Sequence, residues 1–520
     1  MSQEKIIIRR TSILINNYDI GDSYKLEKRF SVWDNLRHCR TAKGMYYDEY
    51  NKILYLPRGI DIGILERTFE ANAFYEESHD PYDEVEPVLI KYLPRDDVQK
   101  EAIEFVLGGG KWISNRFSSQ LSVNLNTGKG KTYVAIAMAS FLRQRTMMIT
   151  ASVNWINQWK NCIMEYTNIK EDEIYILTGR RSIIQLLKGQ KDLKQYKFIL
   201  SSHTTIRNYG EEKGWESVTE LFKFLRIGLK IYDEAHLNFD NMCLIDFFTN
   251  TYRTLYLTAT PARSDRGENL VYQLALKSIP KIDLFDEKTD PHTKCIAIHY
   301  NSHPTPQQVS SCRNIYGFDK LKYIRYIIKK QEFYMMLMLL IDFCTKNGER
   351  TLIYIGLNEA INTVYQWLCY TFPHLKDEIG IYNSLVPKEI KNEQLSKMII
   401  LSTIKSCGTA MDIRGLKYTV NLADPMGSLV LTRQALGRTR ADDTYFIDVV
   451  DNGFASLRNY YGKKRPVYLK YGKSLNDINV TDEDLLNKQR EISLRVNQLY
   501  AEQIRNENQS KNLIEVVKRI

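Results

Sequence analysis

The segment NTGKGKT at 126–132 brings together residue types that can hold a triphosphate. Gly128 and Gly130 leave room for a tight turn whose backbone amides face phosphate oxygens. Lys131 can then reach the β and γ phosphates, and Thr132 can offer its hydroxyl to Mg²⁺. The sequence therefore predicts a phosphate-binding loop that consists of Thr127, Gly128, Lys129, Gly130, Lys131 and Thr132.

The segments on either side of this loop help to distinguish a binding site from a flexible surface turn of the same composition. The apolar run LSVNL at 121–125 predicts a buried strand, and YVAIAMASFLRQR at 133–145 predicts a helix. A helix that begins at the loop places its positive end under the phosphates. The order of strand, loop and helix therefore favours the binding site.

A second segment, YDEAH at 232–236, supplies the carboxylates that such a site needs. The hydrophobic run that starts at Leu229 predicts a buried strand, and open α/β sheets bind ligands beyond the carboxyl ends of their strands. Asp233 would hold Mg²⁺, and Glu234 would position and polarise the attacking water. The alternative is an acidic surface turn after a buried strand, which agrees less well with the phosphate loop upstream.

With these two segments, the chain resembles the superfamily 2 helicases and translocases over most of residues 95–450. Further motifs occur in the order of that family, and they are ITASVNWINQW at 149–159, FILSSHTTI at 198–206, TLYLTATPAR at 254–263, ILSTIKSCGTAMDIRGL at 400–416 and QALGRTR at 434–440. The resemblance implies an α/β fold with two RecA-like parallel-sheet motor domains in tandem. It also implies ATP and Mg²⁺ as cofactors.

The resemblance assigns roles to individual residues as well. Besides the phosphate loop and Asp233, it implies nucleotide contacts by Gln99, His236 and Asp412. The metal ligands that it implies are Thr132 and Asp233. Contacts with a nucleic-acid backbone are implied for Ser152, Trp159, Ser202, Thr204, Arg263 and Thr403. Coupling between hydrolysis and nucleic-acid binding is implied for Thr258, Thr260 and Gly408.

The motif at 434–440 is expected to contribute to catalysis from the second motor domain. Phosphoryl transfer spreads negative charge over the equatorial oxygens, and an arginine delivered there can raise the rate by about 10³–10⁵. Arg438 matches the first arginine of the family, and Gln434 matches the glutamine that senses the phosphates. Arg440 lies one position before the family's second arginine. Surface ion pairs after a helix are the alternative role for these arginines.

The segment before the phosphate loop departs from the family pattern. Many relatives carry an Arg-x-Tyr-Gln element whose glutamine contacts adenine. Here Gln99 fits, but Val98 replaces the aromatic residue and Arg95 is displaced by one position. ATP remains the expected nucleotide, and the expected catalytic residues are Glu234, Gln434, Arg438 and Arg440.

Length and composition agree with a soluble protein of several domains. The chain has 520 residues, of which 43% are hydrophobic and 26% charged. Its eight cysteines include no C-x-x-C pair, so neither a disulfide scaffold nor a structural zinc site is expected. No apolar run reaches the ~20 residues of a membrane span, and we expect a cytoplasmic protein. The net charge of +10 favours a polyanionic partner.

We expect five segments along the chain. Short alternating stretches in residues 1–90 predict a small β-rich accessory domain, which resembles the DNA-gripping leader domains of phage recombination helicases. A structural cap on the first motor domain is an equally good interpretation. The other segments are a RecA-like domain at 91–290, a connecting region at 291–330, a second RecA-like domain at 331–475 and a helical C-terminal tail at 476–520.

Two basic and aromatic stretches leave their roles open. The first, at 313–330, would follow a phosphate backbone while Tyr316 or Phe318 stacks on a base, or would form an amphipathic helix on the second motor domain. The second, RNYYGKKRPVYLKYGK at 458–473, would contact nucleic acid or form a plain edge hairpin. In the tail, helical spacing predicts a buried stripe of Leu485, Leu486, Ile492, Leu494, Val496 and Leu499.

The resemblance predicts an ATP-dependent DNA helicase or translocase that moves 3′ to 5′ and remodels branched DNA in replication, recombination or repair. The chain is most similar in character to phage helicases that migrate branches, which would act in the host cytoplasm. The expected partners are ATP, single-stranded, forked or branched DNA, and replication or recombination proteins, without a membrane, and the protein is expected to be a monomer. Three alternatives stay open: a duplex translocase that does not separate strands, an RNA helicase, and a nucleotide-switched clamp.

Overall fold

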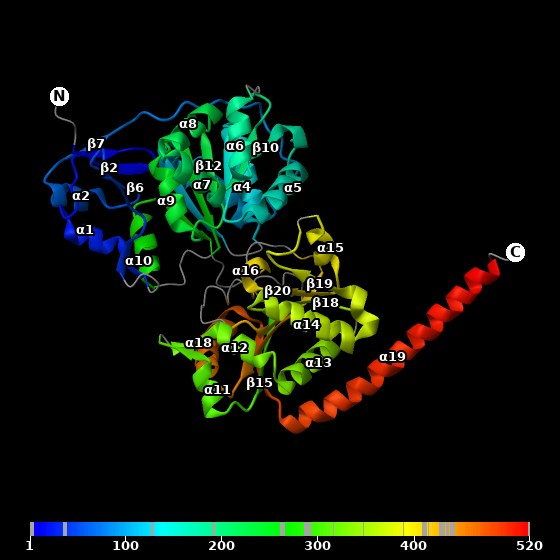
Figure 1. The fold of residues 1–520 in the computed structure, drawn as a ribbon. Helices are drawn as coiled ribbons and strands as arrows, with labels where there is room; N and C mark the ends of the chain where they lie inside the picture. The colour runs from blue at the N-terminus through cyan, green and yellow to red at the C-terminus, as the bar shows by residue number, and fades with distance from the viewer. Residues whose placement is uncertain are drawn as a thin grey trace. The chain divides into compact units, whose positions relative to one another are not determined.

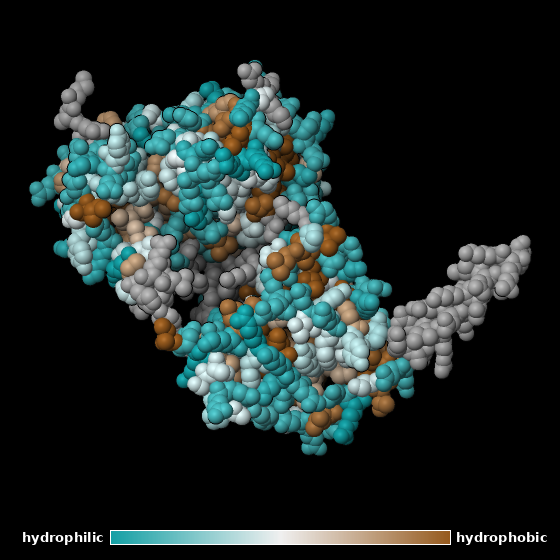
Figure 2. Space-filling model, in the orientation of Figure 1, coloured by the Kyte–Doolittle hydropathy of each residue, from teal (hydrophilic) through white to brown (hydrophobic). Residues whose placement is uncertain are grey.

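The computed structural model describes residues 5–34, 39–125, 129–189, 193–259, 266–284, 293–315, 317–346, 348–387, 389–407, 413, 415–425, 432, 436 and 443–517. The chain divides into two compact units, Met1–Glu287 and Lys288–Ile520. No helix in the described part of the chain is long and apolar enough to cross a membrane. On the face drawn in Figure 2, hydrophobic residues form separate small groups among hydrophilic ones.

The first unit is built around a seven-stranded sheet in which all strands are parallel. The strands, in their order across the sheet, are β10 (Ile174–Ile176), β11 (Phe198–Ser202), β9 (Thr146–Thr150), β12 (Leu229–Tyr232), β13 (Arg253–Thr258), β8 (Gln120–Leu125) and β14 (Lys281–Leu284). Every residue of the five inner strands is buried, as expected for a parallel sheet with both faces covered.

Helices lie alongside this sheet in the first unit (Figure 1). They are α3 (Asp97–Leu107), α4 (Lys131–Leu142), α5 (Ile156–Tyr166), α6 (Gly179–Lys188), α7 (His203–Lys213), α8 (Glu216–Leu225), α9 (Phe239–Phe247) and α10 (Arg266–Ala275). Helix α4 is apolar on all sides, and Tyr133 to Ser140 are buried without interruption. It is therefore a core helix rather than an amphipathic surface helix.

A five-stranded mixed sheet precedes the motor sheet in the same unit. Its strands, in order, are β5 (Tyr46–Asp48), β6 (Ile53–Pro57), β2 (Ser12–Ile15), β1 (Ile6–Ile8) and β7 (Ala73–Tyr75). Strand β7 pairs in parallel with β1, and the other pairs are antiparallel. The remaining elements are the ribbon of β3 (Ser31–Asp34) and β4 (Cys39–Ala42), and helices α1 (Tyr24–Arg29) and α2 (Ile62–Phe69).

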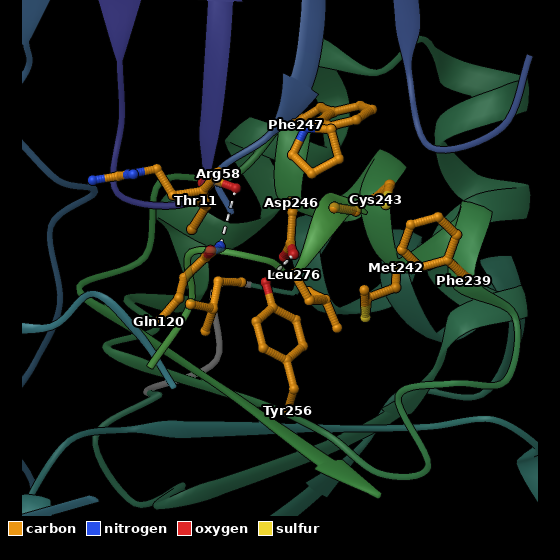
Figure 3. Close-up of a pocket in the computed structure, with 13 residues that line it drawn as sticks. Thr11, Arg58, Gln120, Phe239, Met242, Cys243, Asp246, Phe247, Tyr256 and Leu276 are labelled. Atoms are coloured by element: carbon orange, nitrogen blue, oxygen red, sulfur yellow. Dashed lines mark hydrogen bonds between the residues drawn. The ribbon is translucent and has the colours of Figure 1, made fainter. Parts of the chain in front are cut away.

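The N-terminal sheet and the motor sheet share one hydrophobic core, to which Leu56 of β6 and Phe247 of α9 both belong. Figure 3 shows a small cavity at this contact, where the Gln120 amide donates to the Thr11 carbonyl at 3.1 Å. The cavity has a volume of about 10 Å³, enough for one water molecule at most. This packing agrees with the interpretation of the segment as a cap on the motor, and its DNA-binding role stays a prediction.

The second unit contains another seven-stranded parallel sheet. Its strands, in order, are β19 (Ile379–Tyr382), β20 (Ile399–Ser402), β18 (Arg350–Ile355), β21 (Leu416–Ala423), β22 (Thr444–Asp451), β15 (Thr293–Tyr300) and β23 (Ser474–Asn479). Beside it are the short strands β16 (Arg313–Asn314) and β17 (Gly317–Phe318), and helices α11 (Pro306–Ser311), α12 (Lys320–Ile327), α13 (Gln331–Thr345), α14 (Asn358–Thr371), α15 (Lys391–Ser396), α16 (Ile404–Cys407), α18 (Ala455–Tyr471) and α19 (Asp482–Val517).

The segment predicted as a connecting region at 291–330 differs from that expectation. Its strand β15 lies inside the second sheet, between β22 and β23, with Cys295 and Ala297 fully buried. Further along, the Phe318 ring lies 5.6 Å from the Tyr323 ring in the core of this unit. Of the two interpretations offered for this stretch, the amphipathic helix on the second motor domain agrees with the structure.

Two expectations for the C-terminal part are also corrected. Of the two interpretations of the stretch at 458–473, the edge hairpin is wrong, because residues 458–471 belong to α18, where Lys464 and Tyr468 turn inward to Asp448. Contact of this stretch with nucleic acid stays a prediction. In α19, Leu485, Ile492 and Val496 are buried, whereas the other predicted members of the stripe are exposed, namely Leu486, Leu494 and Leu499. The buried face is therefore narrower than predicted, and its three residues belong to the core of the second unit, where α19 packs against α13.

Candidate active site

The phosphate loop connects β8 to α4 at the carboxyl end of the motor sheet. Its residue Gly130 has a left-handed φ of 81° and precedes a helix whose amino end is capped by no side chain of the described residues. A Cβ atom on Gly130 would clash with the Gln99 side-chain nitrogen, and the left-handed φ is strained for any other residue, so this position favours glycine. The uncapped amino end leaves backbone N–H groups of α4 available to an anion, as a triphosphate site requires.

Gln99 supports the loop from helix α3. Its side chain is 4% exposed, and its amide nitrogen donates to the Lys129 carbonyl at 3.1 Å. Its amide oxygen accepts from the backbone N–H of Arg95 at 2.9 Å. The amide nitrogen and the amide oxygen of Gln99 therefore both hold backbone groups near the loop in place. The contact with adenine that the sequence predicted for this residue stays a prediction.

The acidic pair lies where β12 ends, two strands away from β8 in the same sheet. Lys131 Nζ is 2.8 Å from Glu234 Oε1, and both side chains are 12% exposed. Trp159 Nε1 donates to Asp233 Oδ2 at 2.9 Å. Glu234 has a left-handed φ of 50°, and its Oε2 accepts from the Ala259 N–H at 3.4 Å. A non-glycine residue in that conformation is strained, and such strain is common at functional sites.

Burial and charge act on the two carboxyl groups in different ways. Burial raises the pKa of Asp233, and the charge of Glu234 raises it further, against the opposing charge of Lys131. Burial also acts to raise the pKa of Glu234, but Lys131 and then His236 lower it below its ordinary value. Lys131 thus holds Glu234 as the charged member of the pair.

Thr258, a predicted coupling residue, and His236, a predicted nucleotide contact, meet in the buried interior. His236 Nδ1 and Thr258 Oγ1 are 2.7 Å apart, and both residues are at most 2% exposed. His236 Nδ1 also lies 3.4 Å from Glu234 Oε2. A movement of Thr258, the last residue of β13, would therefore be transmitted to Glu234 through the His236 side chain.

These groups fit a nucleotide held with Mg²⁺. The ammonium group of Lys131 is paired with the carboxylate of Glu234. An incoming phosphate would take the place of that carboxylate beside Lys131. Thr132 lies in the first turn of α4, and the carboxylate of Asp233 comes from the neighbouring loop; both are oxygen ligands of the kind that Mg²⁺ prefers. The arrangement can support phosphoryl transfer.

Two predicted nucleic-acid contacts are contradicted by burial. Trp159 is 3% exposed and lies on the inner side of α5 together with Ile156 and Ile163. Ser202 is fully buried, and its hydroxyl accepts from the Thr205 N–H at 3.2 Å as the amino cap of α7. Neither side chain can reach a backbone outside the protein. The spacing of Ile156, Trp159 and Ile163, which marks one helix face, was the signal that sequence reasoning missed.

The other predicted residues are exposed or lie outside the described part. Thr204 is exposed, and Ser152 and Thr403 are partly exposed, so their contacts with nucleic acid stay predictions. The predicted residues that lie outside the described residues are Thr127, Gly128, Thr260, Arg263, Gly408, Asp412, Gln434, Arg438 and Arg440. Their roles stay predictions as well.

Trp159→Phe is expected to lower ATP turnover by about tenfold and to raise the Mg²⁺ concentration for half-maximal activity. The change keeps an aromatic ring in the core but removes the N–H that holds Asp233 Oδ2. Hydrogen bonds to charged groups contribute about 1.5–3 kcal/mol, and 1.4 kcal/mol corresponds to tenfold in rate. Steady-state kinetics over a Mg²⁺ titration would measure both effects.

Trp155→Phe is the matched control. Trp155 is 4% exposed, immediately precedes the same helix, and its indole N–H donates to no residue that the structure describes. We expect less than about a twofold change for this variant, since only packing is altered. Equal effects of the two changes, with no shift in Mg²⁺ dependence, would show that Trp159 is a packing residue only.

Comparison with known proteins finds a match over the segment that contains this site. Residues 93–263 match the family model described as "Type III restriction enzyme, res subunit". Over 176 residues the chain is 30% identical to the DNA 3'-5' helicase XPB of Kineococcus radiotolerans, a match that covers 34% of this chain and 28% of that protein. The chain thus spans less than a third of the length of that relative.

Two further similarities cover more of the chain. It is 23% identical to the putative helicase 161L of Invertebrate iridescent virus 6 over 376 residues, which are 66% of this chain and 75% of that protein. The structure of S. cerevisiae Dbp5 bound to RNA and ADP BeF3 covers 77% of this chain and 93% of its own, with a TM-score of 0.51 and 13% identity. The latter is a likeness of fold alone.

The phosphate loop, the acidic pair and the pair of His236 and Thr258 lie together in the first motor sheet, and a second parallel sheet of the same size follows. The family model covers the phosphate loop and the acidic pair, and the Dbp5 structure has a similar fold. The segment at 93–263 is thus similar to the superfamily 2 helicases and translocases.

Proposed function

We propose that the protein is an ATP-dependent DNA helicase or translocase that moves 3′ to 5′ and remodels branched DNA in replication, recombination or repair. The observation that carries the ATPase part is the buried group of Lys131, Asp233 and Glu234 at the carboxyl end of one sheet. The relatives named DNA 3'-5' helicase XPB support DNA as the track and 3′ to 5′ as the direction.

The pairing of Lys131 with Glu234 suggests how binding prepares hydrolysis. A γ phosphate that reaches Lys131 competes with Glu234 Oε1 for the same ammonium group. Once displaced, Glu234 is free to accept a hydrogen bond from the attacking water and to hold it in line with the phosphorus. Bound Mg²⁺ would neutralise charge on the phosphates, with Thr132 and Asp233 as its protein ligands.

The second motor domain supplies the rest of the mechanism that we propose. Arg438, supported by Gln434 and Arg440, would meet the charge that develops on the phosphoryl group. Hydrolysis would then be transmitted through Thr258 and His236 to segments that hold the phosphate backbone. Because phosphate contacts carry no sequence information, movement would be largely independent of base sequence.

The test is a comparison of ATPase stimulation, strand displacement and triplex displacement on single strands, forks, four-way junctions and RNA hybrids at stated salt. We expect DNA to stimulate hydrolysis more than RNA, and forked or branched DNA to be unwound. Triplex displacement without strand displacement would indicate a duplex translocase, which the relative named DNA 3'-5' translocase XPB2 of Sulfurisphaera tokodaii makes the second candidate. Absence of stimulation by any nucleic acid would contradict the proposal.

A further inference from the structure

Two arginines of the N-terminal segment lie against tyrosine rings beside the motor sheet. Arg10, in the turn between β1 and β2, has its guanidinium carbon 4.5 Å from the ring centroid of Tyr252, and its Nε donates to the Tyr252 carbonyl at 2.9 Å. Arg58, directly after β6, lies 6.0 Å from the ring centroid of Tyr75. We name these four residues the arginine–tyrosine surface.

Neither arginine has a carboxylate partner among the residues that the structure describes. The adjacent Arg9 differs, because its Nε lies 2.8 Å from Glu76 Oε2. Burial lowers the pKa of Arg58, and the charge of Arg10 lowers it further against the opposing influence of Tyr75. Two partly buried cations that repel each other without a counter-charge are unfavourable, and a bound anion would relieve that repulsion.

The arginine–tyrosine surface lies at the opposite edge of the motor sheet from the nucleotide site. Tyr252 immediately precedes the first residue of β13, whereas Asp233 and Glu234 follow the last residue of the parallel neighbour β12. Strands of this kind rise about 3.3 Å per residue, so the six residues of β13 separate the two edges by about 20 Å. A ligand of the arginines is therefore distinct from the nucleotide.

Aromatic side chains flank the two guanidinium groups. Tyr75 and its neighbour Phe74 on the edge strand β7 are 55% and 50% exposed. The Tyr252 ring also lies 5.2 Å from the rings of His79 and Tyr82. Figure 3 shows the Arg58 side chain extending away from the small cavity that its backbone helps to line. Guanidinium groups bind phosphates in a planar fork, and exposed rings stack on unpaired bases.

We propose that the arginine–tyrosine surface binds the phosphodiester backbone of a second nucleic-acid segment, so that the protein holds two arms of a branched substrate. This inference rests on the proposed function, because it presumes a motor that already holds one strand elsewhere. Guanidinium groups recognise free phosphate by the same chemistry, and the experiment separates the two sources of the anion.

The test uses the full chain with Arg10→Gln and Arg58→Gln combined. Fluorescence anisotropy would measure affinity for a four-way junction and for a single strand of equal length between 50 and 200 mM salt. Loss of two phosphate contacts makes the fall of log affinity with log salt concentration less steep by about 1.8. Between 50 and 200 mM salt, the wild type should therefore lose about ten times more affinity for the junction than the variant loses. Binding of the single strand, and hydrolysis stimulated by it, should stay unchanged.

Arg9→Gln is the matched control, since it removes the same charge from the neighbouring residue that has a carboxylate partner. Arg58→Gln alone guards against misfolding, because the Arg58 side chain donates to no described residue, and about half of the slope change is expected. A junction slope equal to that of the wild type, or equal losses on junction and single strand, would overturn the inference.

Inorganic phosphate, added at constant ionic strength, tests whether the anion bound by the two arginines is free phosphate. If phosphate raises the melting temperature of the wild type but not of the double variant, while junction affinity is the same in both, the site takes small anions and the inference fails. Failure of the proposed function would look different: no nucleic acid would stimulate hydrolysis by the wild type, whatever the arginine variants show.

Discussion

Glu234→Gln is expected to lower nucleic-acid-stimulated ATP turnover by about 10²–10⁴-fold while nucleotide binding stays the same or tightens. The amide can no longer accept the proton of the attacking water. At the same time Lys131 loses the carboxylate that lies 2.8 Å away and becomes more available to phosphates. Steady-state kinetics would measure the loss of kcat, and equilibrium titration with a fluorescent nucleotide would measure binding.

The control for this variant is Glu171→Gln. Glu171 also lies 2.8 Å from a lysine, Lys160, but its side chain is 72% exposed. An exposed ion pair contributes little to stability, so we expect the turnover to stay within about twofold of the wild type. If Glu234→Gln hydrolyses ATP as fast as this control, the chemistry has been assigned to the wrong carboxylate.

The nucleotide side of the site could be predicted because it depends on local chain order. Gly130 and Lys131 lie between a strand and a helix, and Asp233 and Glu234 directly follow a strand. Parallel strands end at one edge of a sheet, so segments far apart in the sequence meet there. The resemblance to superfamily 2 also predicts a nucleotide site at this edge of the sheet, and the fold brings Lys131 and Glu234 together there.

The direction of individual side chains could not be predicted in the same way. Resemblance of a motif assigns a role to a segment, but the face of a helix decides which side chains are accessible. Trp159 was therefore assigned to nucleic acid, whereas its indole donates to Asp233. Strand β15 was missed for a related reason, since turn-forming residues before it and basic residues after it concealed a buried strand.

A buried ion pair under the acidic loop could not be predicted from the sequence either. Lys230 lies within a hydrophobic run, yet its Nζ is 2.5 Å from Asp246 Oδ1, and the two side chains are 0% and 4% exposed. Asp246 also accepts from the Tyr232 hydroxyl at 2.8 Å and from the Tyr256 hydroxyl at 2.6 Å. Only the packing of α9 on the sheet brings these groups together.

Asp246→Asn is expected to reduce the stability of the first unit by about 3–5 kcal/mol, because it leaves Lys230 charged and unpaired in the interior. Burial lowers the pKa of Lys230, and the charge of Asp246 opposes that shift in the wild type. Tryptophan fluorescence in urea is a suitable measurement. Five of the six tryptophans lie in the first unit, namely Trp33, Trp112, Trp155, Trp159 and Trp215.

Asp240→Asn provides the control on the same helix. Asp240 lies 2.7 Å from Lys43, but both side chains are about one third exposed, so we expect a loss of at most about 1 kcal/mol. Lys230→Met combined with Asp246→Asn should recover most of the stability, because it removes the unpaired charge and keeps an acceptor for one tyrosine hydroxyl and a donor for the other. If Asp246→Asn lowers the urea midpoint no more than Asp240→Asn does, Lys230 is accommodated without its charge partner. In that case the acidic loop is held in place by the stacked rings of Tyr232 and Tyr256 rather than by the ion pair.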